Sequence, residues 1–354
     1  MQITTSFRVI GTDEPVFIVA EAGINHNGDI EIAHKLIDVA ADAGADAVKF
    51  QTFLTEELVS NEAPLAEHHI ANVKDAISHY DILKRVELPF SSFQQLKTHC
   101  EERRIIFLST PYDISSAELL IRMKTELIKV ASSEMMNYPL LEVIGGAGVP
   151  IIFSTGMSNW EEIEDSVNFL KDYNSQLCIL KCTSNYPALP ESINLRGIER
   201  LKESFSNCLI GFSDHTEGNE ISLAALGMGV SVLEKHFTLN KKQWGPDHSS
   251  SMEPDEFSAF VKAVRKTEKA LGERNWKIQK TEEAQRKAMQ KGVYARCNIG
   301  KGEKIDISKV KFMRPKGSIS PKDFCIYLQN KLVKENICSG EEIHVEQIET
   351  AKGG

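Results

Sequence analysis

Two histidines stand at matching positions in two apolar runs that follow one another in the sequence. His215 closes the run 209–215, and His236 lies in the second half of the run 230–239. If these runs are adjacent parallel strands, the two imidazoles converge, and with a nearby oxygen donor such as Glu21 they suit Mn²⁺, Fe²⁺, Co²⁺ or Zn²⁺. A lone histidine more often bonds a backbone carbonyl, but two at matching strand ends favour a divalent metal site.

Cationic and hydroxyl side chains stand at the ends of several other apolar runs. Lys49 and Lys129 supply positive charge, and four serines supply hydroxyl groups: Ser132, Ser154, Ser184 and Ser213. Together these donors would hold a phosphate or a carboxylate, although a local turn explains any one serine better. Glu21 and Glu134 would then act as acid or base groups, the alternative being ordinary salt-bridge partners.

Other polar residues at the same positions extend this candidate site. They are Gln51, Thr110, Tyr112, Asn185 and Tyr186 at run ends, and Asp247 in the loop after the last run. Loops at such positions often recognise substrate hydroxyl groups. The alternative for Asp247 is a solvated turn.

Eight apolar runs separated by stretches of helical period must position these residues. The runs span 16–23, 47–53, 105–112, 127–134, 150–156, 177–187, 209–215 and 230–239. Their near-continuous hydrophobicity is typical of strands buried on both faces. Eight strand–helix units over about 250 residues predict a (β/α)8 TIM barrel, whose functional groups lie at the carboxyl ends of its strands. A doubly wound sheet more often stops at five or six strands.

Alternation along each run tests which side chains share a face. Within most runs the polar candidates have the same parity, as do Lys49 with Gln51 and Glu234 with His236. Lys129 has the opposite parity to Ser132, which leaves open whether a bulge re-aims it or it points away from the interior. The long stretch 54–89 predicts an extra helix over the mouth of the barrel.

The rest of the chain predicts a second, smaller domain. We expect the barrel over 1–272, a charged linker with some helix over 273–291, and a small, mostly β domain over 292–354. The seven cysteines are odd in number and lack a CxxC pair, so we interpret them as reduced thiols. They predict no disulfide framework.

Charge and hydropathy exclude several classes of protein. The 354 residues carry a net charge of −9, which argues against a nucleic-acid binder or a protein that binds anionic membranes. No apolar run is long enough to span a bilayer. With no signal peptide in the sequence, we expect a cytoplasmic protein.

An ordered set of motifs resembles the sialic acid synthase family. The motifs are AEAGINHNG (20–28), AVKFQT (47–52), STPY (109–112), IKVASSE (128–134), FSTGM (153–157), KCTSNYP (181–187), GFSDHT (211–216), EKHFT (234–238), GPDHS (245–249) and MRPKGSISP (313–321). The last resembles the C-terminal antifreeze-like (SAF) domain of that family. The resemblance covers nearly the whole chain, with Tyr112 where many members have Phe and SSE where many have SGE.

This resemblance implies a condensation of phosphoenolpyruvate with an N-acetylated aldose to give a nine-carbon 2-keto sugar acid and phosphate. It implies that His215 and His236 hold a divalent metal, usually Mn²⁺, and that Glu21 assists at the reacting centre. The residues implied to bind phosphoenolpyruvate are Lys49, Lys129, Ser132, Ser154, Ser184 and Ser213, and those implied to hold the sugar are Gln51, Glu134, Tyr186 and Asp247. Arg314 would reach the barrel of a partner subunit, which implies a domain-swapped homodimer.

Alternatives remain at this stage. The phosphate contact of the sixth run is open between Ser184 and Asn185, and the sugar between N-acetylmannosamine and 2,4-diacetamido-2,4,6-trideoxymannose. Another metal-dependent barrel acting on a phosphorylated sugar would need an additional basic pocket, which the sequence does not reveal. A Schiff base on Lys49 or Lys129 is disfavoured by the metal pair, and a glycan- or ice-binding role by the retained polar set.

Overall fold

The computed structural model describes residues 1–64, 73, 78–173, 176–273 and 275–349. The chain divides into two compact units, Met1–Gly272 and Glu273–Gly354. Eight parallel strands form the main sheet of the first unit: β3 (Phe17–Gly23), β4 (Ala47–Thr52), β5 (Ile106–Pro111), β6 (Ile128–Val130), β7 (Ile151–Ser154), β8 (Leu177–Cys182), β9 (Leu209–Asp214) and β10 (Val232–His236).

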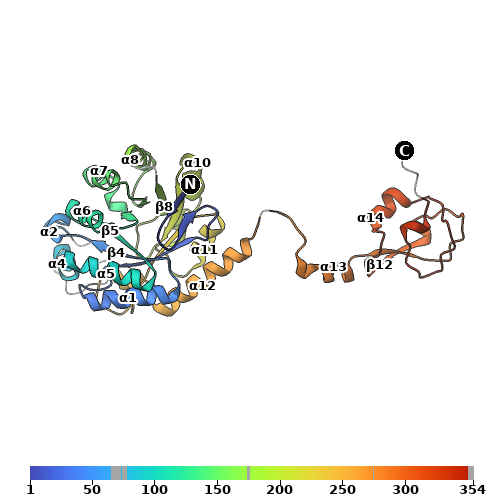
Figure 1. Ribbon diagram of the computed structural model, residues 1–354, viewed down its shortest axis with the longest axis horizontal. Helices are drawn as coiled ribbons and strands as arrows, with labels where there is room; N and C mark the ends of the chain where they lie inside the picture. Colours follow the sequence, from blue (N-terminus) through green and yellow to red (C-terminus); the bar gives the residue numbers. More distant parts are fainter. Residues whose placement is uncertain (65–72, 74–77, 174–175, 274, 350–354) are drawn as a thin grey trace. The chain divides into compact units, whose positions relative to one another are not determined.

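The sheet closes into the predicted barrel. Its strands pair in the order β5-β4-β3-β10-β9-β8-β7-β6, and the two end strands, β5 and β6, contact each other. Figure 1 shows helices arranged around the outside of these strands. They are α1 (Ile30–Ala43), α5 (Phe90–Arg103), α6 (Ile114–Arg122), α7 (Tyr138–Gly146), α8 (Trp160–Tyr173), α10 (Gly197–Ser204), α11 (Glu220–Gly227) and α12 (Pro254–Leu271), with the four-residue α9 (Pro190–Ile193).

Local sequence determines where α1 begins and ends. The Asp29 carboxylate accepts hydrogen bonds from the amides of Glu31 and Ile32, and so satisfies donors that have no partner within the helix. Gly44 ends the helix in the left-handed conformation, with φ of 86°, where glycine carries no steric cost. Between these ends, Ala33 and Leu36 belong to the buried face that packs on the sheet.

One strand is shorter than its apolar run predicted, and this explains the parity of Lys129. The run 127–134 forms a strand only over Ile128–Val130, after which the 3₁₀ turn η1 (Ser132–Glu134) begins. Lys129 therefore points into the barrel as part of the strand, and Ser132 returns to the same side because the chain has left the extended conformation. No bulge is needed.

The stretch 54–89 carries helix, as predicted. Its described parts contain α2 (Thr55–Leu58) and α4 (His79–Val86), whereas residues 65–72 and 74–77 lie outside the described part of the chain. Ser78 caps α4 by accepting from the Asp81 amide at 3.1 Å. Leu83 and Val86 of α4 pack with Ile24 and Phe53, so this helix lies against the strand ends of the barrel.

A hairpin that the sequence analysis missed closes the other end of the barrel. Strand β1 (Gln2–Thr4) pairs antiparallel with β2 (Val9–Gly11), and Ile3 faces Ile10 across the pair. Both isoleucines are fully buried in one cluster with residues such as Phe17 near the amino ends of the barrel strands. Burying each side chain contributes about 2 kcal/mol.

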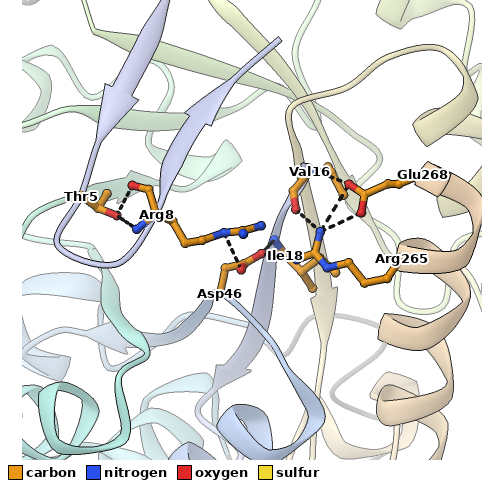
Figure 2. Close-up of polar contacts among 7 residues, drawn as sticks. All are labelled: Thr5, Arg8, Val16, Ile18, Asp46, Arg265 and Glu268. Atoms are coloured by element: carbon orange, nitrogen blue, oxygen red, sulfur yellow. Dashed lines mark hydrogen bonds and ion pairs between the residues drawn. The ribbon is translucent and has the colours of Figure 1, made fainter. Parts of the chain in front are cut away.

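A polar network fastens the amino end of β3 to the last helix of the barrel (Figure 2). Arg265 on α12 donates to Asp46 Oδ2 at 2.6 Å and to the Val16 carbonyl at 2.8 Å. Glu268 accepts from the Val16 amide, and Asp46 accepts from the Ile18 amide at 2.8 Å. The network therefore joins residues that are more than 200 positions apart.

The hairpin is tied into the same network. Arg8 Nε lies 2.9 Å from Asp46 Oδ1, and the Thr5 hydroxyl bonds the backbone of Arg8 across the turn (Figure 2). Asp46 thus pairs with one guanidinium from the hairpin and another, that of Arg265, from α12. One nearly buried carboxylate holds both elements against the amino end of the barrel.

The second unit has its own hydrophobic core, which includes Val293, Ile305 and Phe324. Its regular elements are short: β11 (Gly292–Ala295) pairs antiparallel with β12 (Val310–Met313), and isolated bridges such as Ile299 with Ile337 extend the pairing. The helical turns are η3 (Lys280–Glu282), α13 (Glu283–Met289), η4 (Ile307–Lys309), α14 (Pro321–Asp323), the π-turn η5 (Phe324–Leu328) and η6 (Val345–Gln347). This unit has less regular strand than a mostly β domain implies.

Two general features complete the description. Each of the seven cysteines, all of which lie in the described residues, is a free thiol. Within the described ranges, no helix is both long enough and apolar enough to cross a membrane.

Candidate active site

The predicted site residues meet in one cavity of about 520 Å³ at the carboxyl ends of the barrel strands. Fourteen of them line it: Glu21, Lys49, Gln51, Tyr112, Lys129, Ser132, Glu134, Ser154, Ser184, Tyr186, Ser213, His215, His236 and Asp247. We call this space the main cavity. Parallel strands bring their carboxyl ends to one edge, which is why residues 226 positions apart, such as Glu21 and Asp247, share it.

Lys49 occupies the centre of the main cavity between two carboxylates. Its Nζ lies 3.2 Å from Glu21 Oε2 and 3.1 Å from Glu234 Oε2. Burial opposes the charged form of Lys49, but the two carboxylates overcome it and raise the lysine pKa above its ordinary value. Lys49 is therefore a fixed positive charge at the pH of the cell.

Glu234 also lines the main cavity, although the sequence analysis did not assign it to the site. It is 3% exposed, accepts from the Ser213 hydroxyl at 2.8 Å and lies 3.6 Å from Lys129 Nζ. Burial favours its neutral form, yet Lys129 and Lys49 together hold its pKa well below the usual range. The shared parity of Glu234 and His236 was the signal that could have identified it.

Glu21 and Lys129 are poised to exchange protons near neutral pH. Burial raises the pKa of Glu21 to about 7, against the lowering effect of Lys49. Burial likewise lowers the pKa of Lys129 to about 8, although Glu234 opposes the shift. A carboxyl group and an amine in this range are suited to general acid–base work.

Polar groups suited to a polyhydroxylated ligand gather around Gly23. A Cβ at that position, where φ is +52°, would lie 3.2 Å from both Gln51 Nε2 and Glu21 Oε1, and 3.5 Å from Asp247 Oδ2. Burial raises the pKa of Asp247 to about 6, with Lys49 opposing the shift. Glycine leaves this space free for the three polar ends to approach one another.

Glu134 is held in position by its own turn. Its two carboxylate oxygens accept from the Ser133 hydroxyl at 3.0 Å and from Asn137 Nδ2 at 2.8 Å. Asn137 is also the N-cap of α7, where its Oδ1 accepts from the Leu140 amide. The start of a helix therefore orients this carboxylate toward the main cavity.

Three serine hydroxyls form a cradle on the β6–β8 side of the main cavity. Ser132 Oγ accepts from the Gly156 amide at 2.9 Å. A Cβ at Gly156 would lie 2.1 Å from Ser184 Oγ and 2.8 Å from Ser132 Oγ, so only glycine permits these hydroxyls to approach. Ser154 Oγ is buried with no hydrogen-bond partner in the described part of the chain. A ligand oxygen would satisfy this orphaned group.

His215 and His236 converge as predicted, with ring centroids 5.2 Å apart. His215 Nδ1 bonds the Thr183 carbonyl at 2.8 Å, so the lone pair is on Nε2, which lies 3.4 Å from Ser213 Oγ. His236 Nδ1 is buried without a hydrogen-bond partner among the described residues. Burial lowers the pKa of His215 to about 4 and also lowers that of His236, so both rings are neutral, as metal ligands must be.

These observations fit a divalent cation held by two imidazoles, with other ligands from outside the chain. Across the described ranges, no group of three or more His, Cys, Asp or Glu side chains is arranged to hold a metal ion. Two nitrogens alone leave coordination positions for water and substrate oxygens, which is typical of catalytic rather than structural sites.

An apolar wall on the β3–β4 side of the main cavity was not predicted residue by residue. It consists of Ile24, Leu58, Val59 and Leu83, and His79 of α4 also lines the cavity. Apart from Ile24, these residues come from the stretch 54–89, for which the sequence analysis predicted only a helix over the mouth. No motif within that stretch marks the individual side chains.

Three predicted site residues do not line the main cavity. Thr110 is buried on β5, and its Oγ1 has no hydrogen-bond partner in the described chain. Asn185 lines a neighbouring cavity, whereas Ser184 lines both. Arg314 belongs to the second unit, where its Nε donates to the Met289 carbonyl at 2.9 Å. Its assignment to a substrate site stays a prediction.

Comparison with known proteins identifies the family of this chain. Residues 36–276, more than half of the chain, match the NeuB family. The chain belongs to this family of sialic acid synthases. Membership confirms the resemblance drawn from the motifs.

The sialic acid synthases similar to this chain include proteins with different named products. The chain is 39% identical to N,N'-diacetyllegionaminic acid synthase of Campylobacter jejuni, covering 86% of this chain and 91% of that protein. It is 34% identical to N-acetylneuraminate-9-phosphate synthase of Homo sapiens, covering 88% and 87%.

A solved structure of the family has the same fold. The N-acetylneuraminic acid synthetase of Leptospira borgpetersenii, in complex with citrate, superimposes with a TM-score of 0.72 at 34% identity. The match covers 80% of this chain and 95% of that chain. The fold and the synthase family therefore agree, while the named products of the relatives differ.

Proposed function

We propose that this protein is a transferase that condenses phosphoenolpyruvate with an N-acetylated aldose and water to give a nine-carbon 2-keto sugar acid and inorganic phosphate. One observation carries the proposal. The main cavity places a serine cradle and two buried lysines beside a pair of neutral imidazoles and two carboxylates. A phosphorylated enol and an open-chain sugar need these two kinds of binding group side by side.

In this proposal the serine cradle holds the phosphate of phosphoenolpyruvate. Ser154 and Ser132 donate hydroxyl protons to phosphate oxygens. Lys129, which lines the same cavity, supplies positive charge. When the phosphate leaves, the charge that develops on it meets donors that are already in place. In this proposal Ser213 positions Glu234 and does not bind the phosphate, because its hydroxyl donates its proton to Glu234.

The sugar lies on the other side of Lys49 in the proposed complex. Gln51 and Asp247, which gather near Gly23, bind its hydroxyl groups, together with Glu134 and Tyr186. The methylene carbon of phosphoenolpyruvate then bonds the aldehyde carbon, and water adds to C2 before phosphate departs. The former aldehyde oxygen takes up a proton, and the water that adds to C2 gives one up; Glu21, with a pKa of about 7, transfers this proton. The C2–O bond to phosphate then breaks as the C2 hydroxyl becomes the carbonyl, and its proton leaves with the phosphate.

The proposed cofactor is a divalent metal, most simply Mn²⁺, held by His215 and His236. Such a cation supplies Lewis acidity, which polarises the aldehyde oxygen of the sugar. The residues of the chain do the rest: the Thr183 carbonyl orients the His215 ring, and Lys49 keeps Glu21 and Glu234 apart while balancing both charges.

We further propose that the second unit is an antifreeze-like (SAF) domain and that the chain forms a domain-swapped homodimer. The support is the motif MRPKGSISP over 313–321, which contains Arg314. Arg314 would contact the acylamino group of the sugar in the partner's barrel. Its test is given in the Discussion.

The deciding experiment measures phosphate release from phosphoenolpyruvate with Mn²⁺ and, in parallel, N-acetylmannosamine or 2,4-diacetamido-2,4,6-trideoxymannose. Preference for the first sugar identifies a neuraminate synthase, and preference for the second identifies a legionaminate synthase. If neither sugar supports phosphate release, the result contradicts the proposal. The assay is then repeated with other aldoses, including phosphorylated ones.

A further inference from the structure

A second cavity of about 590 Å³ adjoins the main cavity, and the function proposed above does not use it. Its lining comes from residues 155–163, 181–185 and 194–201, at the carboxyl ends of β7 and β8 and the first turns of α8 and α10. We call it the side cavity. Three residues, Met157, Cys182 and Ser184, line both cavities and form the wall between them.

One residue of the serine cradle, Ser184, belongs to this wall. Gly156 lies so close to Ser184 that a Cβ on the glycine would be 2.1 Å from Ser184 Oγ. A group bound on the cradle therefore lies next to the side cavity. Met157, which is 72% exposed, is the flexible apolar side chain of the wall.

The charged side chains that line the side cavity are both cationic. They are Lys181 and Arg200, and none of the lining residues in the described chain carries a carboxylate. Arg200 stacks its guanidinium on the Trp160 ring, 3.8 Å from the centroid. Lys181 Nζ donates to the Cys182 carbonyl at 3.0 Å and lies 3.3 Å from Thr183 Oγ1. In a chain of net charge −9, this pairing of two positioned cations is a local exception.

Backbone groups add to this positive field. Helix α8, of 14 residues, begins at Trp160, and α10, of eight residues, begins at Gly197. Both starts line the side cavity, and helix amino ends carry partial positive charge. The first turns of these helices carry Glu161 and Glu162 on α8 and Glu199 on α10, and none of the three lines the side cavity. Glu162 accepts from the Asn159 amide at 2.8 Å.

We propose that the side cavity is a second site for a phosphate dianion, held by Lys181 and Arg200. Its occupant is the inorganic phosphate released on the serine cradle. This phosphate moves from the main cavity into the side cavity while the sugar acid still fills the opening of the main cavity. The same chemistry would also receive the phosphate of a phosphorylated sugar, and the sequence alone did not reveal this basic pocket. The source of the phosphate, but not the site itself, rests on the proposed function.

The test uses calorimetric titration of inorganic phosphate into the full-length protein loaded with Mn²⁺, with and without saturating phosphoenolpyruvate. Two phosphates are expected to bind, of which phosphoenolpyruvate displaces the one on the cradle. Lys181→Gln/Arg200→Gln should weaken the remaining phosphate by at least about tenfold. Arg200→Gln alone, which removes the exposed partner, should weaken it in the same direction if the double variant does not fold.

A charge-matched control distinguishes a specific phosphate site from general electrostatic attraction of phosphate to the protein. Arg122→Gln/Lys266→Gln removes two exposed cations, on α6 and α12, and should leave both phosphates bound as in the wild type. Ser154→Ala should weaken only the phosphate that phosphoenolpyruvate displaces. With the side cavity intact, phosphate should inhibit turnover in a mixed pattern against phosphoenolpyruvate, and in the double variant the pattern should become competitive.

Two results overturn the proposal. One is a single phosphate that phosphoenolpyruvate displaces completely, and the other is a second phosphate that the double variant retains. Failure of the proposed function gives a different result. In that case phosphoenolpyruvate displaces no phosphate and is not consumed, but Arg200→Gln still lowers the affinity for inorganic phosphate. With N-acetylmannosamine 6-phosphate as substrate, a raised KM in Arg200→Gln and an unchanged KM for N-acetylmannosamine would identify the sugar phosphate as the occupant.

Discussion

Lys49 Nζ lies 3.1 Å from Glu234 Oε2, and both side chains are almost completely buried. Glu234 also pairs with Lys129, so one carboxylate balances two ammonium groups in the centre of the barrel. Removing it would leave two buried cations without their common partner, which is a costly arrangement in a low-dielectric interior.

We therefore expect Glu234→Gln to lower kcat/KM by at least about 100-fold, which corresponds to about 2.7 kcal/mol. Phosphate release from phosphoenolpyruvate measures it. Glu191→Gln, on an exposed part of the barrel, is the control and should retain wild-type rates. A variant with wild-type kcat/KM would show that Lys49 and Lys129 need no shared counter-charge.

Ser154→Ala removes a buried hydroxyl that has no partner in the described chain. If its partner is a phosphate oxygen, we expect KM for phosphoenolpyruvate to rise about tenfold and KM for the sugar to stay the same. Steady-state kinetics with each substrate varied in turn measures the difference. Ser192→Ala deletes a hydroxyl bonded to the Leu189 carbonyl on the surface and should change neither constant. An equal rise in both constants would contradict a phosphate role.

His215→Ala should abolish stoichiometric binding of Mn²⁺, because the chain offers two imidazoles and one alone binds weakly. Metal content after dialysis, measured by elemental analysis, is the first readout. The second is activity, which should vanish in the wild type on chelation and return with Mn²⁺. His34→Ala, on the outer helix α1, should retain the metal. Full metal content in His215→Ala would disprove the two-histidine site.

Arg314→Ala tests whether the second unit contributes to a sugar site. We expect KM for the sugar to rise at least about tenfold and KM for phosphoenolpyruvate to stay unchanged, since the proposed contact is with the acylamino group. Lys311→Ala, on strand β12 just before Arg314, is the control. Unchanged kinetics for Arg314→Ala would show that Arg314 does not bind the sugar and has only a structural role, through its hydrogen bond to the Met289 carbonyl.

His26 makes stability depend on pH. It is 1% exposed and accepts from the Gly28 amide at 3.1 Å. Burial lowers its pKa to about 3, with Asp29 opposing the shift, against 6.5 as the ordinary value. The unfolded chain therefore binds the extra proton between these two values, so the free energy of unfolding falls as the pH drops below about 6.5.

The expected contribution of His26 to this slope is about 1.4 kcal/mol per pH unit. Urea unfolding at about pH 7, 6 and 5 measures it. His26→Asn should lower overall stability and make the dependence on pH shallower, whereas His344→Asn, at an exposed position in the second unit, should leave the slope as it is. An unaltered slope in His26→Asn would mean that this ring is charged in the folded protein.

The barrel and most of the main cavity could be predicted from the sequence because two regularities act together. Buried parallel strands are continuously apolar, and their carboxyl ends meet, so polar residues at run ends such as Lys49 and His236 had to converge. Parity grouped Lys49 with Gln51, and both line the main cavity. It left the direction of Lys129 open, because the strand ends at Val130 and the alternation ends with it.

Other features had no signal of comparable strength. The strands β1 and β2 have three residues each, too few to show a periodic pattern. The structural role of Ile3 and Ile10 is visible only in their packing on the barrel. Glu234 was visible at a strand end, but its importance lies in the distances to Lys49 and Lys129, which the sequence does not contain. The side cavity likewise depends on helix starts that approach one another only in the folded chain.

The polar network between α12 and the start of β3 affects how the chain folds during its synthesis. Val16 finds its partners on Arg265 and Glu268, and Asp46, which accepts from the Ile18 amide, also pairs with Arg265. These contacts at the start of β3 therefore cannot form until the last helix exists. A chain emerging from the ribosome must expose most of this barrel unsealed until about 270 residues have been synthesised, the period in which unpaired strands are most exposed to aggregation. Truncation within α12 should therefore abolish soluble expression altogether, well before it reaches any residue of the main cavity.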